Sequence, residues 1–299
     1  LEAEMSEVNT PLDRTSRTLT SYFRAFWTIV RNSLVRDMSF RSNFLIECIS
    51  SAAWVFMNLG FYLLIFHYTT EIGKGTGWGK YEFFVFLATT MLVNSVVQAF
   101  FMPNAQEFSE LIRTGNLDFA LLKPIDTQFL VSVHRVEWSS FSNLFVGLAL
   151  LAYSLWHLAS RPEQPVQLSG TTVLLYVGYI LCGIAILYSL MISLAATSIW
   201  LGRNQTLYNF WFYITNFSRY PMEIYGGSYG LPLQVFFTYI IPVLVVVNVP
   251  ARIMAQPLQA DSSGSWFLPI FALFATIFSL LASRLVFRLA LASYRSASS

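Results

Sequence analysis

The chain has 299 residues, of which 55% are hydrophobic, 17% are aromatic and only 11% are charged. Soluble proteins carry about 25% charged residues, so this composition excludes an ordinary soluble protein and predicts a polytopic membrane protein. The formal net charge of +2 is too small to indicate nucleic-acid binding. The two cysteines, Cys48 and Cys182, lie in apolar segments without metal-ligand spacing, which favours a packing role.

The N-terminal part of the sequence is polar and then becomes amphipathic. Residues 1–20 lack an apolar pattern and are predicted to form a disordered cytoplasmic tail. Within 22–35, Phe23, Trp27 and Val30 fall on one helical stripe, with arginines off it. This pattern is typical of an amphipathic helix that lies in the membrane interface. No continuous apolar stretch precedes it, so we expect no cleavable signal peptide.

Residues 21–299 are predicted to form a single transmembrane domain that includes this helix. The rest of the domain contains a series of apolar segments. The predicted membrane spans are 44–68, 81–102, 136–159, 171–201, 206–220 and 266–291. The glycine-rich loop 69–80 lacks the spacing of a phosphate-binding loop, so we interpret it as an extracytoplasmic turn. The segment 171–201 carries no charge and is longer than a hydrocarbon core of about 30 Å requires. We therefore expect its end to protrude into the cytoplasm.

The segment 232–254 is apolar but interrupted by prolines, and its topology depends on the charges around it. With six spans and both termini cytoplasmic, most arginines and lysines are inside. The cations left outside are Lys74, Lys80, Arg161, Arg219 and Arg252. A seventh span would place the C-terminal arginines outside, against the positive-inside rule. We therefore predict a re-entrant helix pair hinged at Pro242 and shielded by other helices, with an ordinary kinked span as the alternative. The fold class is then all-α, with six transmembrane helices, an N-terminal interfacial helix and a re-entrant pair between spans five and six.

The longest polar interruption, 103–130, has the features of an ordered structure. Pro103 suits the first turn of a new helix, and Gly115 suits a helix C-terminus. Phe108 begins an apolar stripe with Leu111 and Ile112, and Asp126 or Thr127 is positioned to cap a following helix. The pattern is compatible with an ordinary ordered loop, or with a docking surface for another protein.

Two motifs in this region resemble those of a known family. Arg113-Thr-Gly-Asn-Leu-Asp118, followed by Leu121-Leu-Lys-Pro124, is similar to a pattern in type-2 (ABC-2-like) exporter permeases, closest to the viologen-exporter-like subunits. Tyr220-Pro221, after the fifth span, resembles a second feature of that group. The similarity covers about Tyr22 to Arg295 and agrees with the predicted topology.

This resemblance implies a permease subunit in a bacterial plasma membrane, with both termini cytoplasmic. A separate ABC ATPase subunit would bind ATP and Mg²⁺, and this chain would hold no cofactor. A second permease chain, identical or homologous, would complete the transporter among membrane lipids. The ATPase would dock on 103–124, and the expected coupling residues are Glu107, Glu110, Arg113, Gly115, Leu117, Asp118, Lys123 and Pro124.

The sequence contains no recognisable catalytic or metal-binding constellation. Its three histidines are far apart and have no ligand partners at suitable spacing. The candidates for a path taken by a hydrophobic or amphipathic substrate (drug, dye or lipid) are Asn58, Asn94, Gln98, Tyr208, Trp211 and Tyr213. Amides in membrane spans also serve as links between helices, which is the alternative here. The residues expected to hinge the re-entrant pair are Tyr220, Pro221 and Pro242.

Two other classes of function remain as alternatives. A membrane-embedded lipid-modifying transferase would use the residues near His134–Glu137 at the cytoplasmic face. A passive channel would need a charged or carbonyl-rich filter, and no such sequence is apparent. The absence of a charge deep in any predicted span disfavours an ion-coupled transporter, and agrees with energy supplied by a separate ATPase.

Overall fold

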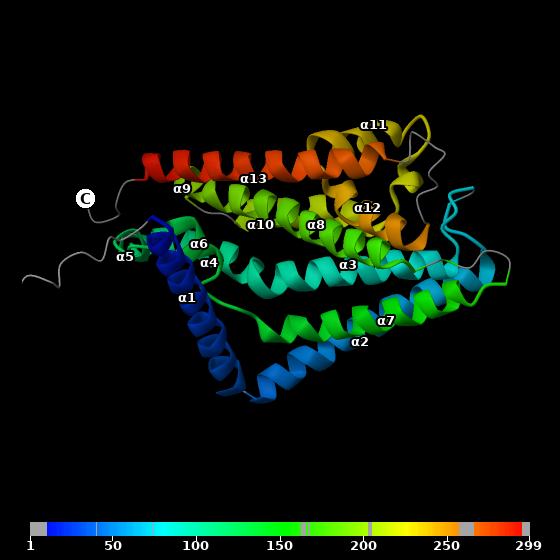
Figure 1. Cartoon of the computed structure of the whole chain (residues 1–299), viewed down its shortest axis with the longest axis horizontal. Coiled ribbons are helices and arrows are strands. Elements are labelled where there is room, and N and C mark those ends of the chain that lie inside the picture. The colour runs from blue at the N-terminus through cyan, green and yellow to red at the C-terminus, as the bar shows by residue number, and fades with distance from the viewer. Residues whose placement is uncertain are drawn as a thin grey trace, which may run out of the picture.

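The computed structural model describes residues 11–39, 41–73, 75–162, 166, 168–202, 205–256 and 266–294. In this part the chain forms a bundle of long helices that run side by side, while α1 crosses one end of the bundle (Figure 1). The main helices are α1 (Pro11–Ser39), α2 (Arg41–Tyr68), α3 (Lys80–Phe100), α4 (Met102–Arg113), α5 (Asn116–Leu121), α6 (Thr127–Ser132), α7 (Phe141–Ala159), α8 (Gly170–Ala196), α9 (Ser198–Leu201), α10 (Gln205–Asn216), α11 (Leu231–Val235), α12 (Val243–Ala255) and α13 (Phe267–Ser293). Short 3₁₀ helices are η1 (Trp138–Ser140), η2 (Phe217–Arg219) and η3 (Met222–Tyr225), and η4 (Phe236–Ile240) is a π-helix.

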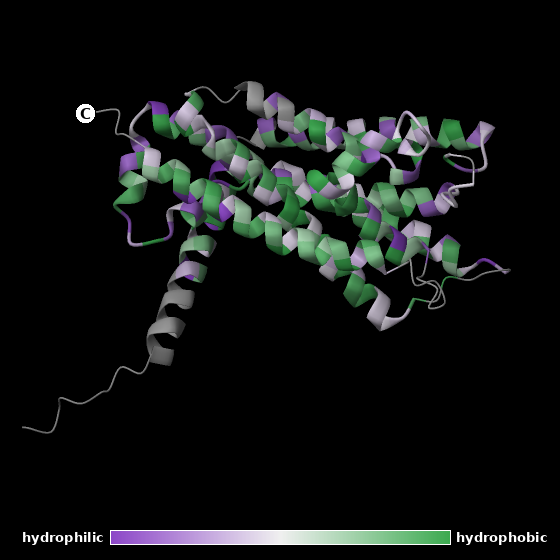
Figure 2. Cartoon of the chain, turned by 90° about the horizontal axis from the view of Figure 1, so that it is seen from above, coloured by the Kyte–Doolittle hydropathy of each residue, from purple (hydrophilic) through white to green (hydrophobic). Residues whose placement is uncertain are grey.

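The all-α polytopic membrane fold is confirmed. Five helical stretches of the described chain are long and apolar enough to cross a membrane: Ser42–Tyr68, Lys80–Arg113, Trp138–Ala159, Gly170–Leu201 and Phe267–Ser293. A bent pair, Leu231–Ile240 with Val243–Ala255, raises the number to six if it is counted as one span. Hydrophobic residues dominate the middle of the long helices, and hydrophilic residues are more frequent toward both ends of the bundle (Figure 2).

The central helix is α3. In the most apolar stretch of α3 and its continuation α4, 72% is buried inside the chain, whereas the corresponding share for α2 is 6%. It packs against α7, α8 and α12. The helices α8 and α12 approach closely at Gly183, where an added Cβ would lie 2.7 Å from the carbonyl oxygen of Val246. Small residues allow such close approach in membrane bundles, where packing replaces the hydrophobic effect as the main attraction between helices.

The N-terminal helix is longer than predicted. We expected an interfacial helix over 22–35 after a disordered tail, but α1 begins at Pro11 and ends at Ser39. Residues 11–20 therefore belong to the helix, since Pro11 suits a first helical turn and no glycine or proline interrupts the sequence that follows. Residues 1–10 lie outside the described part of the chain.

The predicted fifth span, 206–220, is shorter in the structure than a membrane crossing requires. It consists of α10, with 12 residues, and η2, with 3 residues. A helix needs about 20 residues to cross the hydrocarbon core. The chain turns away at Tyr220-Pro221, because proline has no N–H to continue the helical hydrogen bonds.

The segment predicted as a re-entrant pair is sharply bent. Its two limbs meet at 88°, and the break between Ile240 and Val243 contains Pro242, the predicted hinge. The chain on both sides of the segment lies beside the same loop. Trp78 Nε1 donates to Glu223 Oε2 of η3, ahead of the segment, at 2.8 Å, and Gln256 Nε2, directly after the segment, donates to the Gly77 carbonyl at 2.8 Å. The chain thus enters and leaves at one end of the bundle. Its re-entry into a bilayer stays a prediction.

Candidate functional site

The segment predicted to couple to an ATPase folds as two helices joined by a tight turn. The first, α4, continues from α3 with only Phe101 between them. The turn is made by Gly115, whose φ of 72° lies in the left-handed region that favours glycine. The second helix, α5, follows directly, so the predicted helix end at this glycine is found where expected.

The inner side of this hairpin is anchored in the bundle. Phe108 of α4 and Leu117 of α5 are fully buried, and they pack with Phe287 of α13 and Ile192 of α8. The rings of Phe108 and Phe287 are 5.8 Å apart. Leu117 was expected among the ATPase contacts, but its burial makes it a packing residue that attaches the hairpin to the membrane helices.

The outer side of the hairpin and the turn that follows it, residues 113–124, form what we call the coupling tip. It lies at the end of the bundle opposite the 69–80 loop (Figure 1). Its most exposed apolar side chains are Phe119 and Leu122, at 68% and 81% of their surface. Next to them, Arg113, Lys123 and Pro124 are exposed. Large apolar side chains ringed by charge are typical of an interaction surface.

The acidic residues predicted for coupling differ in their surroundings. Glu110 is exposed and accepts a hydrogen bond of 2.9 Å from Arg113 Nε, so the two side chains form a surface ion pair within α4. Glu107 is half-buried. Asp118 lies near Tyr294, just after α13, and the pKa of that phenol is raised, first by burial and then by Asp118. Asp118 therefore interacts with the C-terminal end of the chain, although it lies within the coupling tip.

A polar network attaches Asp126 and Gln128, which follow the coupling tip, to α8 and α13. Asp126 caps α6 by accepting from Phe129 N at 3.0 Å, and it forms an ion pair with Arg284 of α13. The hydrogen bonds from Arg284 are the main cause that lowers the pKa of Asp126. Gln128 accepts from Arg284 at 2.9 Å and donates to the Tyr188 hydroxyl of α8 at 3.1 Å. These bonds connect the residues after the coupling tip directly to α8 and α13.

The structure also brings together three of the predicted path residues. Asn58 of α2 and Asn94 and Gln98 of α3 line one cavity of about 210 Å³, which we call the amide pocket. Sequence reasoning missed other residues of its lining, notably Asn143 of α7 and Arg219 of η2. Asn143 is an amide within an apolar helix, which is a signal that the sequence offers. Arg219 enters the pocket only because η2 packs against α3.

Trp211 and Tyr213, two aromatic residues predicted for the path, do not line this pocket. Trp211 is buried in the core at 5% exposure, and Tyr213 is exposed at 66%. The Tyr208 side chain lies outside the described part of the chain. Of the predicted hinge residues, Tyr220 lines the amide pocket instead, while Pro221 is buried where η3 begins.

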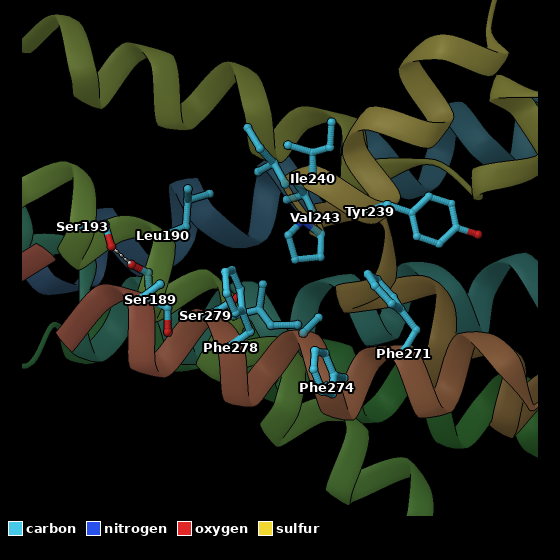
Figure 3. Close-up of a pocket in the computed structure, with 15 residues that line it drawn as sticks. Ser189, Leu190, Ser193, Tyr239, Ile240, Val243, Phe271, Phe274, Phe278 and Ser279 are labelled. Atoms are coloured by element: carbon cyan, nitrogen blue, oxygen red, sulfur yellow. Dashed lines mark hydrogen bonds between the residues drawn. The ribbon is translucent and has the colours of Figure 1, made fainter. Parts of the chain in front are cut away.

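A second cavity lies at the break of the bent pair (Figure 3). Its volume is about 370 Å³, and its walls come from α8, α13 and the residues around Pro242. Phe271, Phe274 and Phe278 of α13 line one side, and Tyr239 lies on the other. Serine hydroxyls provide most of its side-chain polarity, so the cavity suits an apolar occupant such as a hydrocarbon chain.

The residues of the transferase alternative lie outside both cavities. His134 and Arg135 are exposed, and the backbone of Arg135 is held by two hydrogen bonds of 2.7 Å to Asn104. Glu137 is half-buried, and burial is the main cause that raises the pKa of its carboxyl group. None of the three lines either cavity. Among the described residues, no group of His, Cys, Asp and Glu could hold a metal ion.

Comparison with protein families decides the class of this protein. The model of the ABC-2 family transporter proteins matches residues 52–298. The chain belongs to this family. It is a multi-pass integral membrane protein of the permease type, and the resemblance noted from the motifs is confirmed at the level of the family. Neither the curated proteins nor the solved structures contain a match to the chain.

Proposed function

We propose that this permease is the membrane subunit of an ATP-driven exporter, with a separate ABC ATPase docked on its coupling tip. The observation that carries the proposal is the construction of the tip in a chain of the ABC-2 family. It is apolar and exposed on its outer side, through Phe119 and Leu122, and anchored on its inner side by Leu117. A surface built in this way is suited to receive a force from a partner.

The anchoring explains how motion of an ATPase would reach the membrane helices. Pressure on the tip is transmitted through Phe108 and Leu117 to α8 and α13. The ion pair of Asp126 with Arg284 adds a polar connection to the same helix, α13. ATP and Mg²⁺ would act on the partner. Rigid-body movement of packed helices is a common way to convert such a push into a change of access.

The cargo would be a hydrophobic or amphipathic molecule, such as a drug, a dye or a lipid. The amide pocket supports this, because its walls combine amides with aromatic rings. A second permease chain, identical or homologous, would face this one. The location in a bacterial plasma membrane with cytoplasmic termini, and the assignment to the viologen-exporter-like group, rest on the sequence motifs and the charge distribution alone.

Co-purification from native membranes tests the proposal. The tagged chain should bring down an ATPase at about one copy per permease. A Phe119→Glu/Leu122→Glu double variant should lose that ATPase. Tyr68→Glu, which makes a similar change at an exposed aromatic residue beside the 69–80 loop, should keep it.

Two results would contradict the docking role: recovery of the permease without any ATPase, or equal recovery with the double variant. Lipid-modifying activity that disappears in a His134→Ala variant would instead support the transferase alternative.

A further inference from the structure

Arg219 is an exposed residue, yet it lines a pocket between membrane helices and does not lie beyond the end of a span. Sequence analysis placed it outside the membrane, at the end of a full fifth span. In the structure it ends η2, after only the 12 residues of α10 and 3 residues of η2. Fifteen helical residues reach roughly 23 Å, less than the hydrocarbon core of about 30 Å. It shares the amide pocket with Asn58 and Asn94, which lie well inside the membrane helices α2 and α3.

No carboxylate compensates this cation in the described structure. None of the ion pairs there includes Arg219, and the amide pocket has no acidic residue in its lining. The guanidinium lies over the ring of Phe212, 5.8 Å from its centroid. This cation–π contact positions the group. Within the described chain, no hydrogen bond engages the N–H donors of its guanidinium. An ionisable residue at membrane depth usually has a partner and a function.

The rest of the pocket indicates what that partner is. Within the described chain, the amides of Asn94 and Gln98 have no hydrogen-bond partner, although Asn58 donates to the Trp54 carbonyl. Trp54 and Tyr62 provide flat apolar walls. The pocket therefore combines aromatic surface, free amides and one unpaired positive charge. Phosphates of resident lipids lie at the membrane surface, so an anion at this depth has to be carried there on an apolar body.

We propose that the amide pocket binds cargo that has an aromatic body and an anionic group, with Arg219 as the residue that selects for the negative charge. The inference that such cargo is transported rests on the proposed function. The inference that it binds in the pocket does not. Permanently cationic molecules are disfavoured at the same pocket, since Arg219 repels them and no carboxylate attracts them.

Two xanthene dyes of opposite charge test the proposal. Binding of fluorescein, an anion, and rhodamine 123, a cation, is measured by fluorescence polarisation on the detergent-purified chain. Fluorescein should bind more tightly. In Arg219→Gln the ratio of the two affinities should fall about tenfold or more, since a hydrogen bond to a charged group is lost. Arg219→Lys should keep much of the preference, and Arg288→Gln, at an exposed position of α13, should keep all of it.

Transport of the same dyes, with the co-purified ATPase in phosphatidylcholine vesicles, separates this inference from the proposed function. Arg219-dependent binding of fluorescein without ATP-dependent transport of either dye would support the pocket as a binding site and contradict its part in export. ATP-dependent transport of both dyes with a ratio unchanged in Arg219→Gln would support the exporter and overturn the role of Arg219. Equal affinity for both dyes in the unmodified chain would also overturn it. Elution profiles and thermal unfolding of each variant confirm that it is folded.

Discussion

Leu117 and Leu122 offer a matched pair for testing how the coupling tip works. The two side chains are identical and lie five positions apart, but Leu117 is 0% exposed and Leu122 is 81% exposed. Truncation of a buried leucine to alanine costs about 2–5 kcal/mol, through lost burial and the cavity left behind. Truncation at an exposed position changes stability by about 0.5 kcal/mol or less. The two variants should therefore fail in different ways.

Leu117→Ala should loosen the tip from α8 and α13. If local opening becomes easier by about 3 kcal/mol, the open population rises roughly 100-fold. Trypsin cleavage after Arg113, measured in detergent under native conditions, should accelerate accordingly. Leu122→Ala should leave the cleavage rate unchanged but reduce retention of the ATPase in a pull-down, because an exposed apolar contact is lost.

The outcome that refutes this reasoning is an equal increase in cleavage for the two variants. That result would mean that Leu117 does not anchor the tip. If the Leu122→Ala variant and the Phe119→Ala variant both retained the ATPase fully, the partner would bind elsewhere. Thermal unfolding of both variants serves as the control for global stability, which Leu122→Ala should not alter.

Three further predictions follow from the same geometry. Gly115→Ala should cost about 1 kcal/mol from backbone strain alone, because φ is 72° and no atom lies within 4 Å of an added Cβ. It should lower transport per ATP hydrolysed, which an unchanged ratio would contradict. Asp126→Asn should lower the thermal stability at neutral pH. The native pKa of Asp126 is depressed below 3.8, so the stability from its pairing with Arg284 is present above that value and lost as pH falls. The variant should therefore show a flatter acid dependence of unfolding than the unmodified chain, and identical curves would refute the pairing. Gly183→Ala should destabilise by about 1–3 kcal/mol, since its Cβ would meet a backbone carbonyl of α12 at 2.7 Å. Gly178→Ala, in open space on the same helix, is the control and should be neutral, with thermal unfolding in detergent as the measurement.

Much of the fold follows from local features of the sequence. The low charge content and long apolar segments determine a helical membrane protein, because a backbone in lipid must satisfy its hydrogen bonds internally. The end of α4 at Gly115 and the break at Pro242 follow from backbone restrictions of single residues. The motif Arg113–Asp118 indicates the ABC-2 family by its residues alone, and the family match over 52–298 agrees with it.

The tertiary structure decided which residues face a partner and which face the core. Leu117 and Leu122 belong to the same short motif, and only the packing of α5 against α8 and α13 distinguishes the anchor from the exposed contact. Likewise, Arg219 looks like a residue beyond the end of a span until the short α10 places it in the amide pocket. The periodicity of a sequence shows which residues share a face of one helix. Whether that face packs in the core or meets a partner, and whether a charge lies in a pocket, depends on neighbours that are distant in the sequence.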